Sequence, residues 1–360
     1  MNTDFQLPFA EAAFSLQRWD YIAIALFFII LSVVGYRAGR GERANSEAYF
    51  LAGRKLPWYV VGGSFIASNI SSDQFIGMVG AAMVYGVCVS LYEWANVATY
   101  ALLIWFFVPF LLASKVFTTP EYLEKRFSPT VRTLFAVVTV ISNVVAFLAA
   151  VLYGGALALQ GLFGWELWPS IIGLGLVAGV WAVYGGLSSV AWTDLFTVTV
   201  MLVGGILVTV FGLLALAPEG GGIIDGFHVM LERNEATSGQ WKEAVQSNTR
   251  ELAGTETYNR LSVIQPVTHP MTPTVSMITF LLSVSLWYNV LNQFMIQRVL
   301  GAKNMYHARM GIVFAGWLKV ILPVITIVPG MILFAMKPEL LLIEPWGDVK
   351  PAADKGYVQL

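Results

Sequence analysis

The stretch Ala67-Ser68-Asn69-Ile70-Ser71-Ser72-Asp73-Gln74 places six polar residues out of eight inside an otherwise apolar run over residues 57–80. Ser, Asn and Asp side chains compete for backbone hydrogen bonds and weaken a helix. A discontinuous helix that lines a cavity tolerates such a stretch, because its freed carbonyls can coordinate a small cation. The alternative interpretation is a polar helix face packed within a bundle.

The composition of the rest of the chain shows where this stretch must lie. Of 360 residues, 57% are hydrophobic and 12% are charged, against about 25% charged in soluble domains, and the mean hydropathy is +0.69. These values exclude a soluble globular protein and a disordered one. A net charge of −1 offers no basis for binding nucleic acid, and the single cysteine, Cys88, forms no internal disulfide. The sequence predicts an all-α polytopic membrane protein.

Runs of about 20 apolar residues predict the membrane-spanning helices. The runs are 20–37, 57–80, 85–113, 133–160, 166–184, 188–216, 273–297 and 311–336. The first run is not a cleavable signal, because Asp4, Glu11 and Arg18 precede it and no basic segment does.

Twelve of the 21 basic residues lie in three groups of short connecting segments, which the positive-inside rule places in the cytoplasm. They are Arg37, Arg40, Arg43, Arg54, Lys55, Lys115, Lys125, Arg126, Arg132, Arg298, Lys303 and Arg309. We therefore expect residues 1–19, 217–272 and 337–360 to be extracellular. The segment 217–272 is the one sizeable polar insertion and has room for one short helix.

Four charged residues fall inside the predicted spans: Asp73, Glu93, Asp194 and Lys319. A charge at membrane depth costs a few kcal/mol or more, so such residues face a cavity or a partner. Asp194 is also compatible with solvation near the cytoplasmic surface, and Lys319 with snorkelling. Glu93 lies at the centre of its run, from which its carboxylate does not easily reach the membrane–water interface, so it indicates a functional site within the membrane.

A second polar cluster lies in the seventh run. Its members are Ser283, Ser285, Trp287, Tyr288, Asn289, Asn292, Gln293 and Gln297. Aromatic rings beside amides suit a hydroxyl-rich ligand, through stacking and paired hydrogen bonds. The alternative is an interfacial aromatic belt with interhelical hydrogen bonds.

Two classes of function remain, a secondary transporter and a membrane enzyme or channel. The three histidines fall outside the spans, and no HExxH or Ser/His arrangement shares a common depth. Nothing in the chain is typical of a selectivity filter. The interrupted helix therefore favours a transporter, which is not an enzyme and needs no organic cofactor.

Five stretches make the chain similar to a known family. They are Ala67 to Gly77, Tyr92-Glu93-Trp94, Tyr184 to Asp194, Asn292 to Arg298 and Gly311 to Lys319. In this order they resemble the sodium/solute symporter family, and within it the sodium/sugar branch. The resemblance spans about residues 20–340.

The resemblance implies a LeuT-type fold of two inverted five-helix repeats. Residues 20–37 would be an extra helix, 57–216 the first repeat with its first helix broken, and 273–336 the first two helices of the second repeat. The substrate would lie between the broken first helices of the two repeats. Because the family has three more core helices after this point, we expect the sequence to be a C-terminally truncated piece of a symporter.

The resemblance also implies roles for single residues. Asn69, Gln74, Glu93 and Lys319 would bind the sugar, with Asn96 and Ser285 beside them. Tyr288 would be the inner gate, with Asn289 next to it. The carbonyls of Ala67 and Ile70 would hold Na⁺, and Asp194 would lie on its exit route.

Some residues depart from the sugar-transporting members. Asn96, Ser285 and Asn289 replace other side chains, and Phe147 stands where a galactose-transporting member has asparagine. These departures leave the particular sugar open.

The expected function is sodium-coupled uptake of a hexose-like sugar or polyol by alternating access, as a multi-pass protein of the cell (inner) membrane. The expected partners are a small-molecule sugar, sodium and the lipid bilayer, and nucleic acid is not among them. The alternatives are a sodium symporter for a carboxylate, an amino acid or a sialic acid-like solute, or a non-transporting fragment.

Overall fold

The computed structural model describes residues 17–40, 45–235, 240–242, 259–269 and 271–341, and nearly all of these residues lie in helices. Strand pairing within the described ranges is limited to the isolated bridges Leu56–Ala302 and Gln265–Pro273. Most of the predicted outer segments 1–19 and 337–360 falls outside the described residues.

The first core helix is broken at the polar stretch. Helix α3 (Trp58–Asn69) ends there, and α4 (Ser72–Tyr85) begins after two intervening residues. Between them Ile70 (φ −111°, ψ 120°) and Ser71 (φ −116°, ψ 169°) are extended. The last carbonyls of α3 and the first amides of α4 therefore lack the partners that a continuous helix gives them.

Three further segments complete the region predicted as the first repeat. The first begins with a 3-10 turn and continues as an apolar helix that contains a π-helical turn. Its parts are η3 (Gly86–Ser90), α5 (Leu91–Leu102), η4 (Leu103–Phe107) and α6 (Val108–Ala113). A second helix also contains a π-helical segment: α8 (Pro129–Ser142), η5 (Asn143–Leu148) and α9 (Ala149–Phe163). The third is α10 (Leu167–Leu216).

The remaining described helices lie before, between and after these segments. They are α1 (Arg18–Gly39), α2 (Ser46–Leu51), η2 (Ala52–Arg54), α7 (Thr119–Arg126), α11 (Ile223–Asn234), α13 (Thr274–Phe280), η6 (Leu281–Ser285), η7 (Trp287–Leu291), α14 (Gln293–Leu300), α15 (Met305–Met336) and η8 (Pro338–Leu341). Hydropathy did not predict α2 and α7, because both are short and polar. A second break occurs at Asn292 (φ −67°, ψ 126°), between η7 and α14.

Within the described chain, six helices are long and apolar enough to cross a membrane, and α3 is too short to be one of them. They are Arg18–Gly39, Gln74–Ala113, Pro129–Phe163, Gly185–Leu216, Thr274–Leu291 and Met305–Met336. The predicted runs 166–184 and 188–216 are separated only by Gly186, whose backbone is not helical (φ 58°, ψ −171°), and Leu167–Gly179 is a shorter apolar helix.

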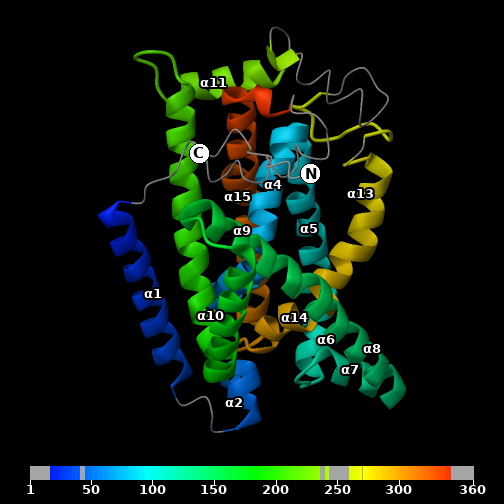
Figure 1. Cartoon of the computed structure of the whole chain (residues 1–360). Helices are drawn as coiled ribbons and strands as arrows, with labels where there is room; N and C mark the ends of the chain where they lie inside the picture. The colour runs from blue at the N-terminus through cyan, green and yellow to red at the C-terminus, as the bar shows by residue number, and fades with distance from the viewer. Residues whose placement is uncertain (1–16, 41–44, 236–239, 243–258, 270, 342–360) are drawn as a thin grey trace, which may run out of the picture.

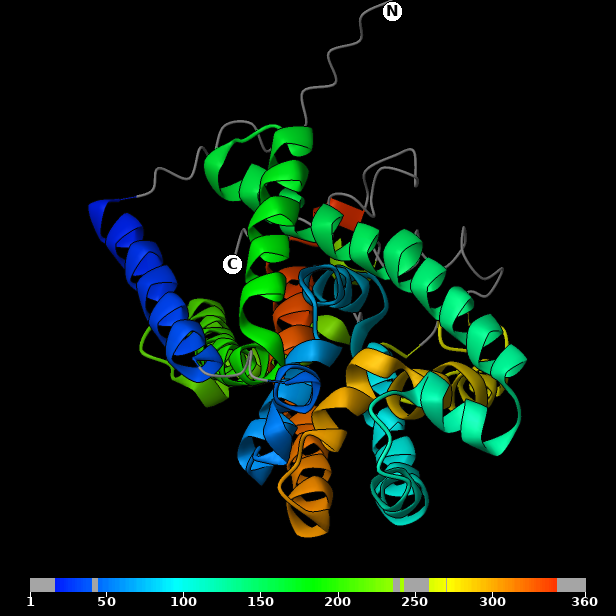
Figure 2. The ribbon, with the colours of Figure 1, turned by 90° about the horizontal axis from the view of Figure 1, so that it is seen from below.

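Helix α15 forms the centre of the bundle, and 78% of its apolar window is buried. It packs against α3, α4 and α10, whereas α1 lies at the edge against α10 (Figures 1 and 2). Figure 1 shows α2, α7 and α14 at one end of the bundle and α11 at the opposite end. The basic segments that include Arg54, Lys125 and Arg298 therefore share one end, as the charge pattern predicts.

Close backbone contact between α4 and α15 depends on Gly330. A Cβ atom on Gly330 would lie 2.4 Å from the carbonyl oxygen of Val79 and 2.7 Å from Cβ of Ala82. We predict that Gly330→Ala lowers the free energy of unfolding by about 1–3 kcal/mol, the usual cost of overpacking. Thermal unfolding of the purified protein in detergent measures the loss. Gly204→Ala is the matched control, because nothing lies within 4 Å of a Cβ atom there; equal transitions in the two variants would contradict the close packing.

Candidate functional site

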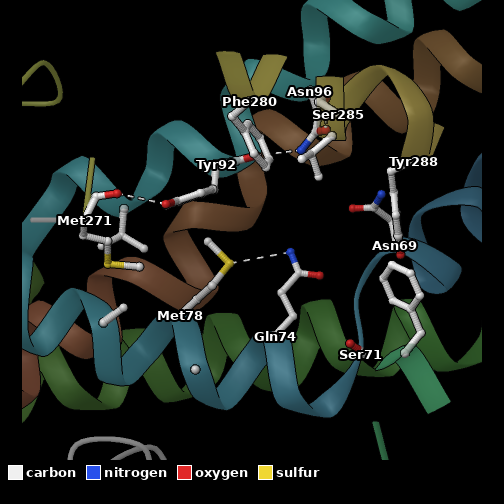
Figure 3. A pocket seen from close by; sticks show the side chains of 15 residues that line it. Asn69, Ser71, Gln74, Met78, Tyr92, Asn96, Met271, Phe280, Ser285 and Tyr288 are labelled. Atoms are coloured by element: carbon white, nitrogen blue, oxygen red, sulfur yellow. Dashed lines mark hydrogen bonds between the residues drawn. The ribbon is translucent and has the colours of Figure 1, made fainter. Parts of the chain in front are cut away.

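A cavity of about 380 Å³ lies beside the break between α3 and α4 (Figure 3). Pockets that bind small molecules typically have volumes of about 300–1,000 Å³. The lining residues come from both sides of the break, from α4, η3, α5 and η5, and from the segment 271–288: Asn69, Ser71, Gln74, Gly77, Met78, Ala81, Val89, Tyr92, Asn96, Phe147, Met271, Phe280, Val284, Ser285 and Tyr288.

A buried ion pair lies behind one wall of this cavity. The Lys319 ammonium donates a short hydrogen bond to Glu93 Oε2, and the Gln74 amide donates one to Glu93 Oε1. Glu93 is 1% exposed and Lys319 is 0% exposed. Of these three predicted sugar-binding residues, Gln74 alone lines the cavity. The structure thus brings the three together but separates Gln74, at the surface of the cavity, from the charged pair behind it.

A second group of predicted residues forms a hydrogen-bonded network. Asn96 Oδ1 accepts from Ser285 Oγ (2.6 Å) and from Asn289 Nδ2 (2.7 Å), and Asn69 Nδ2 donates to Asn289 Oδ1 (3.2 Å). Thr99 Oγ1 joins the network at 3.1 Å from Ser285 Oγ. The sequence analysis missed Thr99, although it lies three residues after Asn96 and so shares its helix face. The network links the α3 break to α5 and to the π-helical segments η6 and η7.

Tyr288 closes one side of the cavity within an aromatic cluster. Its hydroxyl donates to the Ser68 carbonyl oxygen (3.4 Å), so it bridges to the last turn of α3. Its ring centroid lies 5.5 Å from those of Phe147 and Phe294, and Phe147 also stacks on Trp287 (6.1 Å). Phe147, which departs from the resembled family, is therefore part of the cavity wall that carries the predicted gate.

The predicted sodium residues Ala67 and Ile70 lie at the break and are not among the described residues that line the cavity. Ala67 belongs to the last turn of α3 and Ile70 is the extended residue after it, so both lie at the carbonyl end of a helix, where partial negative charge gathers. Among the described residues no group of three His, Cys, Asp or Glu side chains gathers to hold a metal. A cation at this place would be held by carbonyl oxygens, as the sequence analysis expects.

Asp194 is held by two partners outside the cavity. Asp194 Oδ2 accepts from Ser64 Oγ (2.6 Å) and pairs with the Arg298 guanidinium at 3.5 Å. Arg298 also donates to Ser64 Oγ (3.2 Å) and to the Phe294 carbonyl oxygen. Arg298 was predicted as a basic residue at the cytoplasmic end and as part of the stretch Asn292 to Arg298, but no pattern in the sequence indicated its pairing with Asp194 across 104 positions. Ser64 lies one turn before Ala67, so Asp194 is near the carbonyl end of α3.

Among the lining residues that are described, polar side chains gather at one end of the cavity; the side chain of Asp73, which precedes Gln74, lies outside the described part of the structure. In Figure 3, Asn69, Asn96 and Ser285 lie toward one end of the cavity and Met78 and Met271 toward the other. No Asp, Glu, Lys, Arg or His side chain is among the lining residues of the described chain. Amides and hydroxyls both donate and accept hydrogen bonds, and aromatic rings cover apolar ligand faces. The described wall therefore offers both hydrogen bonds and apolar ring faces to a ligand.

Comparison with known proteins identifies the class. Residues 49–357 match the model of the sodium:solute symporter family, and the chain belongs to this family. It is a multi-pass membrane protein, and the match confirms the family resemblance.

The similar curated proteins are sugar and polyol transporters. The chain is 34% identical over 349 residues to a sodium/glucose cotransporter of Vibrio parahaemolyticus, covering 94% of this chain and 60% of the relative. It is 33% identical over 323 residues to a sodium/myo-inositol cotransporter of Mus musculus, covering 88% of this chain and 44% of the relative. The chain thus spans about half the length of these relatives.

A solved structure has the same fold. A Na⁺-coupled sialic acid symporter in a substrate-bound outward-open state superimposes with a TM-score of 0.68 at 17% identity, over 94% of this chain and 68% of that one. The fold is the LeuT-type helical fold that the sequence analysis expects.

The buried Glu93–Lys319 ion pair leads to a prediction about the free energy of unfolding. Glu93→Gln should lower the free energy of unfolding by about 3–5 kcal/mol, because it leaves the buried Lys319 ammonium without its counter-charge. Glu93→Gln/Lys319→Met removes both charges and should regain most of that loss. Thermal unfolding in detergent compares the two variants with the parent. Equal destabilisation in the single and double variants would show that the charges do not depend on each other.

Proposed function

We propose that the protein takes part in sodium-coupled uptake of an uncharged sugar or polyol by alternating access. The amides and hydroxyls among the described lining residues carry this proposal. A carboxylate substrate is bound most strongly by Arg or Lys in charge-assisted hydrogen bonds, and no described Arg or Lys side chain lines the cavity. Lys319 is buried and already neutralised by Glu93, and it does not line the cavity. The names of the glucose and myo-inositol relatives agree with a neutral substrate.

The proposed roles follow the places of the residues around the cavity. Gln74, Asn69 and Asn96 hydrogen-bond the substrate hydroxyls, and Ser285 extends the polar wall. Glu93 and Lys319 fix the Gln74 amide from behind, because Glu93 accepts from both. Tyr288, hydrogen-bonded across to Ser68, closes the cytoplasmic side, with Asn289 holding its helix to Asn96.

Sodium is proposed to bind at the break, on the carbonyls of Ala67 and Ile70. A cation there would balance the partial charge at the end of α3 and fix the two half-helices relative to each other. Since the same break carries Asn69, sodium and sugar would each raise the affinity for the other. Asp194 and Arg298, near the same end of α3, are proposed to lie on the sodium exit route. The membrane potential would contribute about 2.3 kcal/mol per charge per 100 mV.

The proposed orientation follows the basic segments. The end with α2, α7 and α14 lies in the cytoplasm, and the end with α11 and segment 217–272 lies outside. The region 57–216 is proposed as the first inverted repeat and 273–336 as the start of the second, with their breaks at Ile70–Ser71 and Asn292. The bacterial cell membrane is the proposed location, and no catalytic role is proposed.

Uptake into proteoliposomes tests this function. An inward sodium gradient should drive accumulation of a labelled hexose, and unlabelled hexoses or inositols should compete with it, whereas sialic acid and amino acids should not. Gln74→Leu should raise the KM about 5- to 150-fold, the effect of losing roughly 1–3 kcal/mol from one buried hydrogen-bonding group. Gln160→Leu, on an exposed position of α9, is the matched control. Sodium-independent uptake, or competition by the acids instead of the sugars, would refute the proposal.

A further inference from the structure

Arg260 belongs to the polar insertion 217–272, yet it is only 1% exposed. Its guanidinium reaches the last turn of α4, where Nη2 donates to the Met83 carbonyl oxygen (2.8 Å) and Nη1 donates to that of Val84. The cation lies 3.8 Å above the centroid of the Phe334 ring of α15. Helix carbonyl ends carry partial negative charge, and aromatic faces attract cations, so both contacts compensate for the burial of this charge.

Asn234 connects the same guanidinium to two other helices. Its Oδ1 accepts from Arg260 Nε (3.2 Å) and Nη2 (3.1 Å), and its Nδ2 donates to the Met331 carbonyl oxygen (3.1 Å). Asn234 is the last residue of α11, which lies across this end of the bundle (Figure 1). Arg260 therefore joins α4, α11 and α15 at one point.

The backbone of Arg260 docks on the turn that follows α4. Its carbonyl oxygen accepts from the Val87 amide (2.8 Å). Gly86 has a φ of +81°, and a Cβ atom there would lie 2.3 Å from the Arg260 carbonyl oxygen. The side chain of Arg260 thus bonds to the end of α4, and its main chain bonds to the turn that follows.

The same segment continues to the cavity. Met271 lines the cavity, and its carbonyl oxygen accepts from the Tyr92 hydroxyl (3.0 Å). The His269 ring packs edge-on against Tyr85, the last residue of α4, at 5.5 Å between centroids. The segment is therefore anchored at Arg260 and again at Met271, where it covers the cavity.

We propose that Arg260 is a positioning residue that holds the segment containing Met271 against α4 and so keeps the cavity closed at its α11 end. Opening of this end requires the guanidinium to leave the α4 carbonyls and Asn234. We refer to the contacts of Arg260 with the α4 carbonyls and Asn234 as the Arg260 lock. Because α4 also carries Gln74, breaking these contacts and changing the geometry of the binding site occur together. The inference rests on the proposed function only in naming this opening as a transport step.

Cysteine labelling tests, without requiring transport, whether Arg260 restricts access to the α11 end of the cavity. In a Cys88→Ala background, Met271→Cys reports access to the α11 end of the cavity. Gln297→Cys, on α14 at the opposite end of the bundle and outside the cavity, is the reference position. The full chain in permeabilised proteoliposomes, where the reagent reaches both sides, is treated with a maleimide, with no sodium or sugar present. Arg260→Gln should raise the labelling rate at position 271 about tenfold through a shifted closed–open equilibrium, and leave the rate at 297 unchanged.

Two further variants make the outcome decisive. Arg233→Gln is the matched control, because Arg233 lies on α11 at the same end of the bundle but donates to the Ala335 carbonyl oxygen and stacks on Trp241, and so does not bond to α4. Its labelling should match that of the parent. If Arg260→Gln does not fold, Arg260→Lys decides, since lysine keeps the charge but not the forked geometry, and its rate at 271 should exceed that of the parent.

If the Arg260 variants leave the labelling rate at position 271 unchanged, or raise the rates at 271 and 297 equally, the proposed role of Arg260 is wrong. Failure of sugar uptake alone would bear on the proposed function and not on this result.

Discussion

The break at Ile70–Ser71 is the constraint on which the rest of the structure depends. At membrane depth each unpaired backbone group costs several kcal/mol, so an interrupted helix is stable only where protein or a filled cavity surrounds it. Here α15 packs along α3 and α4, and Tyr288 donates to a carbonyl of the last α3 turn. Gly62 and Gly330 allow the close approach of these helices, because Cβ atoms at either position would meet backbone carbonyls at 2.4 Å. Helix α15 thus surrounds both half-helices with protein on one side of the break.

Two charged residues lie next to the cavity, yet neither is among its described lining residues. Glu93 and Lys319 neutralise each other where water does not reach, and each would be costly alone. The pair orients the Gln74 amide, which is the group that faces the cavity. A second, uncharged network through Asn96, Ser285 and Asn289 does the same for Asn69. Two hydrogen-bonded groups, the Gln74–Glu93–Lys319 set and the Asn96–Ser285–Asn289 network, therefore hold the polar wall in place.

Much of this arrangement could be predicted from the sequence, because polar residues are conspicuous in apolar runs. The stretch 67–74, Glu93 and Lys319 stood out on hydropathy alone, and they meet at one place. Gly186 was hidden, because it is one of many glycines, and its positive φ joins two predicted helices at a sharp turn. The buried contacts of Arg298 and Arg260 could not be predicted, since both residues lie in polar segments and their partners are far away in sequence. Pairing of that kind is set by tertiary contacts and leaves no periodic signal.

Equilibrium binding of a labelled hexose to the purified protein, in sodium and in choline at equal ionic strength, tests the central claim most directly. The claim is that one break in one helix couples the ion to the sugar. The account predicts that sodium raises the affinity for the sugar about 5- to 150-fold, the usual range for linked sites. It also predicts that sugar raises the affinity for sodium by the same factor. Equal affinities in sodium and choline would contradict the account.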